Sequence, residues 1–188
     1  MGTDIYLCAE RRRGDGWESV GELDDYEDRN YEFFAILANV WNPIRSTMPY
    51  EFISAARGFP HDLDEETKRN LLLMSGHDPG WAMLRELLSF DWDGKTMRRT
   101  AIVDPSIAHA FINERFDRSQ LAAPYRLPND ARQILLPYAL ANDGTGTRVY
   151  WTDTYRDAVG SEFLDRLFDV LHRIGPPDDV RIVFSFDS

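Results

Sequence analysis

The clearest pattern in the sequence is a strand, a helix and a second strand near the carboxyl end. Arg148 to Thr152 (RVYWT) has the β-branched and aromatic content of a strand. Apolar residues recur every three or four positions from Ser161 to Ile174, which predicts an amphipathic helix that Gly175 ends. Val180 to Phe186 (VRIVFSF) has the composition of a buried strand. This order predicts a right-handed crossover between two parallel strands.

The amino end of the chain predicts a β-hairpin. Thr3 to Glu10 alternates apolar and polar residues, as a strand does when one face is buried. Arg11 to Gly16 (RRRGDG) is typical of a turn, and Trp17 to Glu22 returns as a second strand. We expect this hairpin to supply antiparallel strands to the sheet that holds the carboxyl-terminal strands.

Helices are predicted between these ends. Asp28 is placed to cap a helix from about Arg29 to Trp41, and a second helix is expected from Leu63 to Met74. Ser75 to Gly80 is expected to be a loop, and Trp81 to Phe90 a short helix. Two further features are expected beyond it, a turn at Asp91 to Lys95 and a helix that begins at Pro105 after Asp104.

These elements predict an α+β (mixed α/β) fold in a single domain, residues 1–188. Its mixed sheet is expected to combine the amino-terminal hairpin with the carboxyl-terminal β-α-β unit, with helices on the flanks. The strands at its centre would be Ile5 to Ala9, Val149 to Trp151 and Arg181 to Phe186. Phe34 and Leu167 occupy the middle of apolar helical stripes, so both are predicted core residues.

Charge and composition restrict the function classes. The chain carries 32 acidic and 21 basic residues, a net charge of -11, which disfavours generic nucleic-acid and anionic membrane binding. The one cysteine, Cys8, allows no internal disulfide and fits a reducing compartment. No apolar run reaches the length of a membrane span, and the first residues lack the pattern of a signal peptide. We therefore expect a cytoplasmic protein.

Four segments resemble a group of uncharacterised proteins encoded by bacteriophages and prophages. They are Met1 to Glu10 (MGTDIYLCAE), Arg29 to Asn42 (RNYEFFAILANVWN), Ala56 to Asp62 (ARGFPHD) and Pro176 to Asp187 (PPDDVRIVFSFD). The resemblance implies a phage or prophage origin, an accessory role and the cytoplasm of a bacterial host. That group tends to carry a histidine- and serine-rich stretch before a tryptophan. The similar segment here, Gly76 to Trp81, lacks the serines.

A candidate site for an anionic ligand can be assembled from loop and helix-start residues. An arginine beside a glycine offers a planar donor where the backbone is least crowded, and an aromatic ring adds a stacking surface. The candidate ligand-binding residues are Arg29, Tyr31, Arg57, His77 and Trp81. A structural interpretation stays open: Arg29 would pair with Asp25 or Asp28, Tyr31 would pack in the core, and Arg57 would tie its loop to an acidic helix.

Other chemistry has weaker support. His61 with Asp62, and His77 with Asp78, could bind a divalent metal, but they lack the spacing of a strong metal motif. Asp91 and Asp93 could act as an acid–base pair, although DWDG favours a turn by composition alone. The sequence contains no phosphate loop, nucleophile elbow or HExxH. We expect no metal and no cofactor.

Two functions remain open from the sequence. The first is a non-enzymatic phage accessory protein that binds and blocks or sequesters a host factor, with a host-defence component as one such target. The second is a small enzyme that acts on a phosphorylated or nucleotide-like ligand. The expected partner is accordingly a host protein or a small anionic ligand, and the sequence does not predict the oligomeric state.

Overall fold

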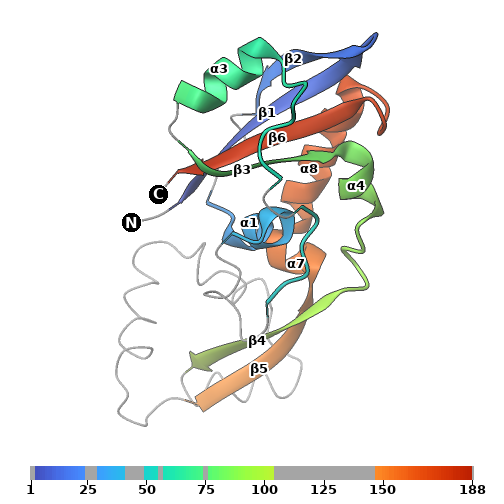
Figure 1. Ribbon diagram of the computed structural model, residues 1–188. Helices are drawn as coiled ribbons and strands as arrows, with labels where there is room; N and C mark the ends of the chain where they lie inside the picture. Colours follow the sequence, from blue (N-terminus) through green and yellow to red (C-terminus); the bar gives the residue numbers. More distant parts are fainter. Residues whose placement is uncertain are drawn as a thin grey trace. The chain divides into compact units, whose positions relative to one another are not determined.

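The computed structural model describes residues 3–23, 29–40, 49–54, 57–73, 76–103 and 147–187 (Figure 1). The chain forms two compact units, the first from residues 1–95 and 154–188 and the second from residues 96–153. The division into one domain stays a prediction. The helix expected after Asp104 lies outside the described residues.

The first unit is built on a four-stranded sheet in the order β2-β1-β6-β3. Its strands are β1 (Asp4–Arg13), β2 (Gly16–Glu22), β3 (His77–Met83) and β6 (Val180–Asp187). Each adjacent pair is antiparallel, and β1 and β6 pair from Asp4 opposite Asp187 to Arg11 opposite Val180. The α+β class and the shared sheet of the hairpin and the last strand are confirmed.

The predicted parallel crossover is wrong. The strand expected around Val149 to Trp151 exists as β5 (Thr147–Thr154), but it pairs with β4 (Thr96–Val103) in a separate two-stranded sheet. The described strands therefore form no β-α-β unit, and the four-stranded sheet is antiparallel rather than mixed. A strand buried on both faces has the same apolar pattern in either sheet type, so periodicity alone could not choose the neighbour of β6.

The helix α1 (Tyr31–Ala38) is shorter than predicted. The side chain of Asn30 accepts a hydrogen bond from the backbone N–H of Phe33, so Asn30 is the N-terminal cap. The helix ends at Asn39, whose φ of 62° is left-handed. The predicted cap, Asp28, and the predicted last residue, Trp41, both lie outside the described residues.

The segment from His77 to Phe90 differs most from expectation. The predicted loop and the first part of the predicted helix form strand β3, and only α4 (Leu84–Ser89) is helical. A Cβ on Gly80 would lie 2.7 Å from the ring of Phe184, so this strand position admits no side chain. The glycine that suggested a loop is therefore required by close packing against β6.

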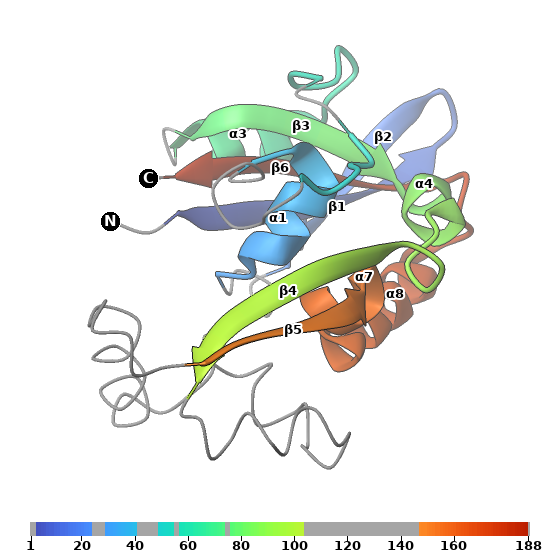
Figure 2. The same cartoon turned by 90° about the horizontal axis from the view of Figure 1, so that it is seen from below.

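The two faces of the sheet are covered by different helices (Figure 2). On one side, the α8 face, Phe34 of α1 packs edge-to-face on Phe186, at 5.3 Å between ring centroids. Helix α8 (Ser161–Ile174) also covers this side and buries Leu164, Leu167 and Leu171. Both predicted core residues, Phe34 and Leu167, are fully buried.

The opposite side, the α3 face, is covered by α3 (Glu65–Leu73) and the loop before it. Here Cys8, Leu71 and Val183 form a small apolar cluster, against which Phe59, Leu63 and Trp81 pack. Cys8 is thus a buried core residue.

The chain leaves and re-enters the first unit at neighbouring points. The backbone N–H of Tyr155 donates to the carbonyl of Lys95 at 3.0 Å, and that of Arg156 donates to the carbonyl of Trp92 at 2.9 Å. Tyr155 begins the short helix α7 (Tyr155–Val159), which the sequence pattern did not predict. The two parts of the first unit, residues 1–95 and 154–188, are therefore joined by backbone hydrogen bonds next to the point where each of them ends or begins.

Candidate functional site

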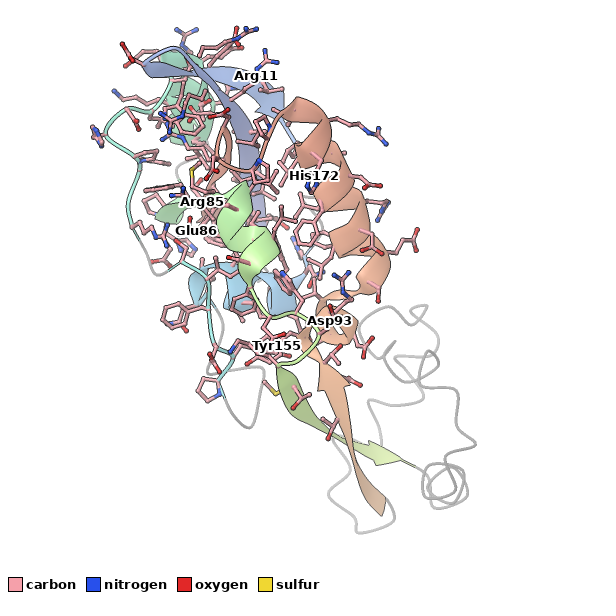
Figure 3. The ribbon with its side chains drawn as sticks, turned by 90° about the vertical axis from the view of Figure 1, so that its right-hand side faces the viewer. Arg11, Arg85, Glu86, Asp93, Tyr155 and His172 are labelled. Carbon is pink, nitrogen blue, oxygen red and sulfur yellow. The ribbon has the colours of Figure 1, made fainter. Side chains whose placement is uncertain are left out.

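Arg57 is held by α4 and β3. Its Nη1 and Nη2 donate to the two carboxylate oxygens of Glu86 at 3.0 and 2.8 Å, which is the bidentate geometry typical of arginine. Its guanidinium also lies over the ring of Trp81, 5.0 Å from the centroid. Figure 3 shows Glu86 on α4, the helix that carries this carboxylate.

The loop that carries Arg57 is shaped by the glycine beside it. Gly58 adopts a φ of 69°, a left-handed conformation that glycine tolerates best. Its backbone N–H donates to the carbonyl of Pro79 at 3.1 Å. This bond ties the loop to the outer edge of β3 and sets Arg57 beside Trp81.

The carboxylate of Glu86 is stabilised in its charged form. Burial raises the pKa of Glu86, but the hydrogen bonds from Arg57 and from the backbone N–H of Met83 outweigh this effect, so the net shift of the pKa is downward. The N–H of Met83 donates at 2.8 Å, which also caps the start of α4. Arg57 thus ties its loop to an ionised carboxylate on α4, a helix that carries one acidic and one basic residue and is therefore not the acidic helix of the structural interpretation.

Arg29 and Tyr31 lie beside the first residues of β1. Arg29 donates from Nε and Nη2 to the two carboxylate oxygens of Asp4 at 2.6 and 3.2 Å. The hydroxyl of Tyr31 accepts from the backbone N–H of Thr3 at 3.3 Å. The hydrogen bond between Arg29 and Asp4 lowers the pKa of Asp4 and raises that of Arg29.

His77 is the first residue of β3. Its Nδ1 lies 2.9 Å from a carboxylate oxygen of Asp78, and its ring centroid lies 6.3 Å from that of Phe186. Asp78 has a φ of 47°, uncommon for a residue other than glycine but less so for aspartate. The left-handed residue lets β3 bulge between His77 and Gly80.

Of the five predicted ligand-binding residues, the structure brings Arg57 and Trp81 together. Asp4 pairs with Asp187 and His77 with Phe186, so the Arg29–Asp4 contact and His77 lie at the same end of the sheet. Trp81 pairs with Val183, further along β3 toward α4. The five residues are therefore distributed between two places along the sheet, and Arg29, Arg57 and His77 each contact a carboxylate.

The sequence interpretation missed a buried charged network on the α3 face. Arg181 and Glu10 are paired across β6 and β1, and Arg181 Nε donates to Glu10 at 2.6 Å. Their side chains are only 3% and 0% exposed. Arg181 also donates from Nη1 to the Asp62 carboxylate at 2.8 Å and from Nη2 to the Asp62 carbonyl at 3.1 Å.

Further contacts complete the network. The second oxygen of Glu10 accepts from the backbone N–H of Asp64 at 2.9 Å. Trp17 donates its indole N–H to Asp62 at 3.0 Å, and its ring centroid lies 4.0 Å from the guanidinium carbon of Arg181. Burial raises the pKa of Asp62, but the hydrogen bond and charge of Arg181 lower it, with a net downward shift.

A signal for this network was present in the sequence. Glu10 and Arg181 are the charged members of otherwise apolar strand segments, YLCAE and VRIVFSF. A charge within such a run must be paired if it is buried. Which two charges meet depends on the β1–β6 register, and the pattern does not contain that register.

The residues of the weaker metal and acid–base hypotheses make structural contacts. Asp62 is bound by Arg181 and Trp17. Asp91 accepts from the backbone N–H of Gly94 at 2.9 Å, which is the predicted turn, and Asp93 pairs with Arg156 at 2.9 Å. Across the described ranges, no three His, Cys, Asp or Glu residues are grouped so as to hold a metal ion.

In the described parts of the chain, no helix has the length and apolar character to cross a bilayer. Comparisons of the chain with known protein families, with curated proteins and with solved structures give no match.

Proposed function

We propose that this protein is a phage- or prophage-type accessory protein that acts without catalysis, by binding and blocking or sequestering a basic host protein. The observation that carries the proposal is that three arginines of the candidate sites are paired with carboxylates of the same chain. Arg29, Arg57 and Arg181 donate to carboxylates of the same chain instead of presenting a free cationic site. The chain uses these charges within its own structure.

The acidic excess supports a basic partner. With 32 acidic and 21 basic residues, one-to-one pairing leaves eleven carboxylates without a basic counterpart in the chain. Several acidic side chains are exposed on helices, among them Glu65 on α3 and Glu162 and Asp169 on α8. A positively charged protein surface is the partner that such a field attracts and steers.

The test is native mass spectrometry of the protein purified from bacterial cells at low ionic strength. We expect a bound protein of basic composition, whose release increases as salt rises toward about 0.5 M, because salt screens exposed charges. The paired substitutions Glu162→Lys with Asp169→Lys, and Glu65→Lys with Glu66→Lys, examine two separate helices. Loss of the partner with one pair and not with the other would locate the contact.

One observation favours the alternative, a small enzyme for a phosphorylated or nucleotide-like ligand. Arg57 and Trp81 place a cation against an aromatic ring, and both side chains are partly exposed. A co-purified metabolite in the native spectrum, with no bound protein, would support this alternative and contradict the binding-protein proposal.

A further inference from the structure

The segment that covers the α3 face, residues 59–73, buries little apolar surface, and we call it the α3 cover. Between Glu65 and Leu71 of its helix, Thr67 and Leu71 are the side chains that are buried. Helix α8, on the opposite side of the sheet (Figure 2), buries four large apolar side chains. Because the stability gained from apolar burial grows with the area buried, the cover is held to the sheet less strongly than α8 is.

Buried hydroxyl groups weaken this contact further. Thr67 and Ser185 are 0% and 1% exposed, and within the described residues the hydroxyl oxygen of each has no hydrogen-bond partner. Ser185 follows Val183 by two positions on β6, so its side chain lies on the α3 face. A polar group that is withdrawn from water without gaining a partner destabilises the arrangement that buries it. The packing of the cover on the sheet therefore carries a cost that the α8 face avoids.

Two glycines that are fixed to the sheet flank the cover. Gly58, with its left-handed φ of 69°, donates its backbone N–H to the carbonyl of Pro79 on β3 at 3.1 Å. At the other end, a Cβ on Gly76 would lie 2.6 Å from Oγ of Ser185, so the backbone of Gly76 lies directly against β6. Both flanking points are thus held by the sheet, and the residues between them can move as one segment.

Polar contacts at the start of the cover hold it against three strands. Glu10 of β1 accepts from the backbone N–H of Asp64 at 2.9 Å, and Arg181 of β6 donates to the carboxylate of Asp62 at 2.8 Å. Trp17 of β2 donates its indole N–H to the same carboxylate at 3.0 Å. The net stability that such contacts supply is modest, because water can replace them once the cover leaves the sheet.

We propose that the α3 cover opens as one unit while the four-stranded sheet and α8 stay folded, and that the contacts of Asp62 are its latch. Opening brings the side chains of Cys8 and Val183 to solvent beside Glu10 and Arg181. The cover therefore controls whether this side of the sheet is accessible. Such an opening has a lower free energy than the unfolding of the whole protein. This inference does not depend on the proposed host partner.

Cys8 reports the opening, because it is the only cysteine in the chain and is buried against Leu71 of α3. The experiment is alkylation of the native full chain with iodoacetamide, in which the Cys8 thiolate displaces iodide, followed by mass spectrometry over a series of urea concentrations below the unfolding transition. Alkylation should be at least about tenfold faster than the global unfolding equilibrium allows. It should also depend less steeply on urea than global unfolding does, since less surface becomes exposed.

Variants should change the opening in opposite directions. Asp62→Asn weakens the latch and should raise the alkylation rate about tenfold. Trp17→Phe keeps an aromatic ring but removes the indole N–H, and should raise the rate about threefold. Thr67→Val keeps the shape of the side chain and removes the unpartnered hydroxyl, so it should slow alkylation about threefold.

Leu167→Ala, on the opposite face, is the matched control. It should lower the melting temperature but leave the alkylation rate within about twofold of wild type, because Leu167 packs on the part that stays folded. The proposal is overturned if Cys8 reacts only as fast as global unfolding permits and if Leu167→Ala accelerates the reaction in proportion to its loss of stability. A rate that Asp62→Asn leaves unchanged also overturns it. Should Asp62→Asn fail to fold, Trp17→Phe decides the question in the same way.

Discussion

The two faces of the four-stranded sheet use alternate residues of the same strands, and different forces hold them. On the α8 face, Ile5, Leu7, Phe184 and Phe186 are buried and apolar, and they pack against helices α1 and α8. On the α3 face, the apolar cluster around Cys8 adjoins the buried Arg181–Glu10 pair and its contacts. Burial of apolar area is non-directional and supplies stability. A buried ion pair is directional.

This difference explains how the loop before α3 is held in place on the α3 face. Glu10 accepts a hydrogen bond from the backbone N–H of Asp64, and Arg181 donates one to the backbone carbonyl of Asp62. The carboxylate of Asp62 in turn accepts a hydrogen bond from the indole N–H of Trp17. These bonds fix the loop before α3 at one position over the sheet. An apolar surface of the same area would hold the loop with less positional specificity. Fixing the register of packed segments is the role best attested for buried polar groups.

The largest effect is expected from breaking the ion pair on the α3 face. Arg181→Ala leaves Glu10 buried without its cation, and we expect a loss of about 3–5 kcal/mol in the free energy of unfolding. Urea denaturation measures it. The paired substitution Glu10→Met with Arg181→Met should recover most of the loss, since no buried charge remains. A single variant within about 1 kcal/mol of wild type would show that water reaches Glu10.

On the α8 face, truncation of the apolar core should cost slightly less. Phe34→Ala and Leu167→Ala remove fully buried side chains, so each should lower the unfolding free energy by about 2–5 kcal/mol. Unlike the ion pair, these positions should accept other apolar residues, such as Phe34→Leu, at smaller cost. A loss below about 1 kcal/mol in either Ala variant would contradict the assignment of the core.

The α3 face should also be the more pH-sensitive of the two. The pKa of Asp62 is lowered in the folded state relative to its usual 3.8. Its contribution to stability is therefore fully present above pH 3.8 and lost as pH falls through the lower folded-state value. The difference in unfolding free energy between wild type and Asp62→Asn should be constant near neutral pH and shrink in acid. A difference that is equal at pH 7 and at about pH 2.5 would exclude this linkage.

The smallest effect is expected at the rim of the α3 face. Arg57 and Glu86 side chains are each 30% exposed, so Arg57→Ala should cost at most about 1 kcal/mol. Thermal unfolding measures this cost, and Arg57→Lys is the control that keeps the charge but not the bidentate contact. Loss of partner or ligand binding with an unchanged melting temperature would support a site at Arg57. A variant that unfolds, or one that keeps full activity, would contradict such a site.

Periodicity predicted the elements whose burial is one-sided or complete along their length. Helix α8 was identified from the helical spacing of Leu164, Leu167 and Leu171, and β6 from the apolar run VRIVFSF. The hairpin was identified from its alternating strand and its glycine-containing turn. Strand β3 was not identified, since Pro79 and Gly80 are typical of loops and Trp81, Leu84 and Leu87 also match helical spacing. Among the five predicted site residues, Arg57 and Trp81 lie together, but the sequence could not give the carboxylate that Arg57 binds, Glu86.

The sequence by itself determined the α+β class, the acidic charge and the burial of elements such as α8 and β6, because these follow from local periodicity and composition. The tertiary structure alone decided which strands are neighbours. It placed β6 beside β1 and β3 and placed β5 with β4. The β1–β6 register places Glu10 opposite Arg181, and the strand order leaves β2 at an edge of the sheet. Strand neighbours are chosen by contacts between residues far apart in the chain, whose energies no local pattern records.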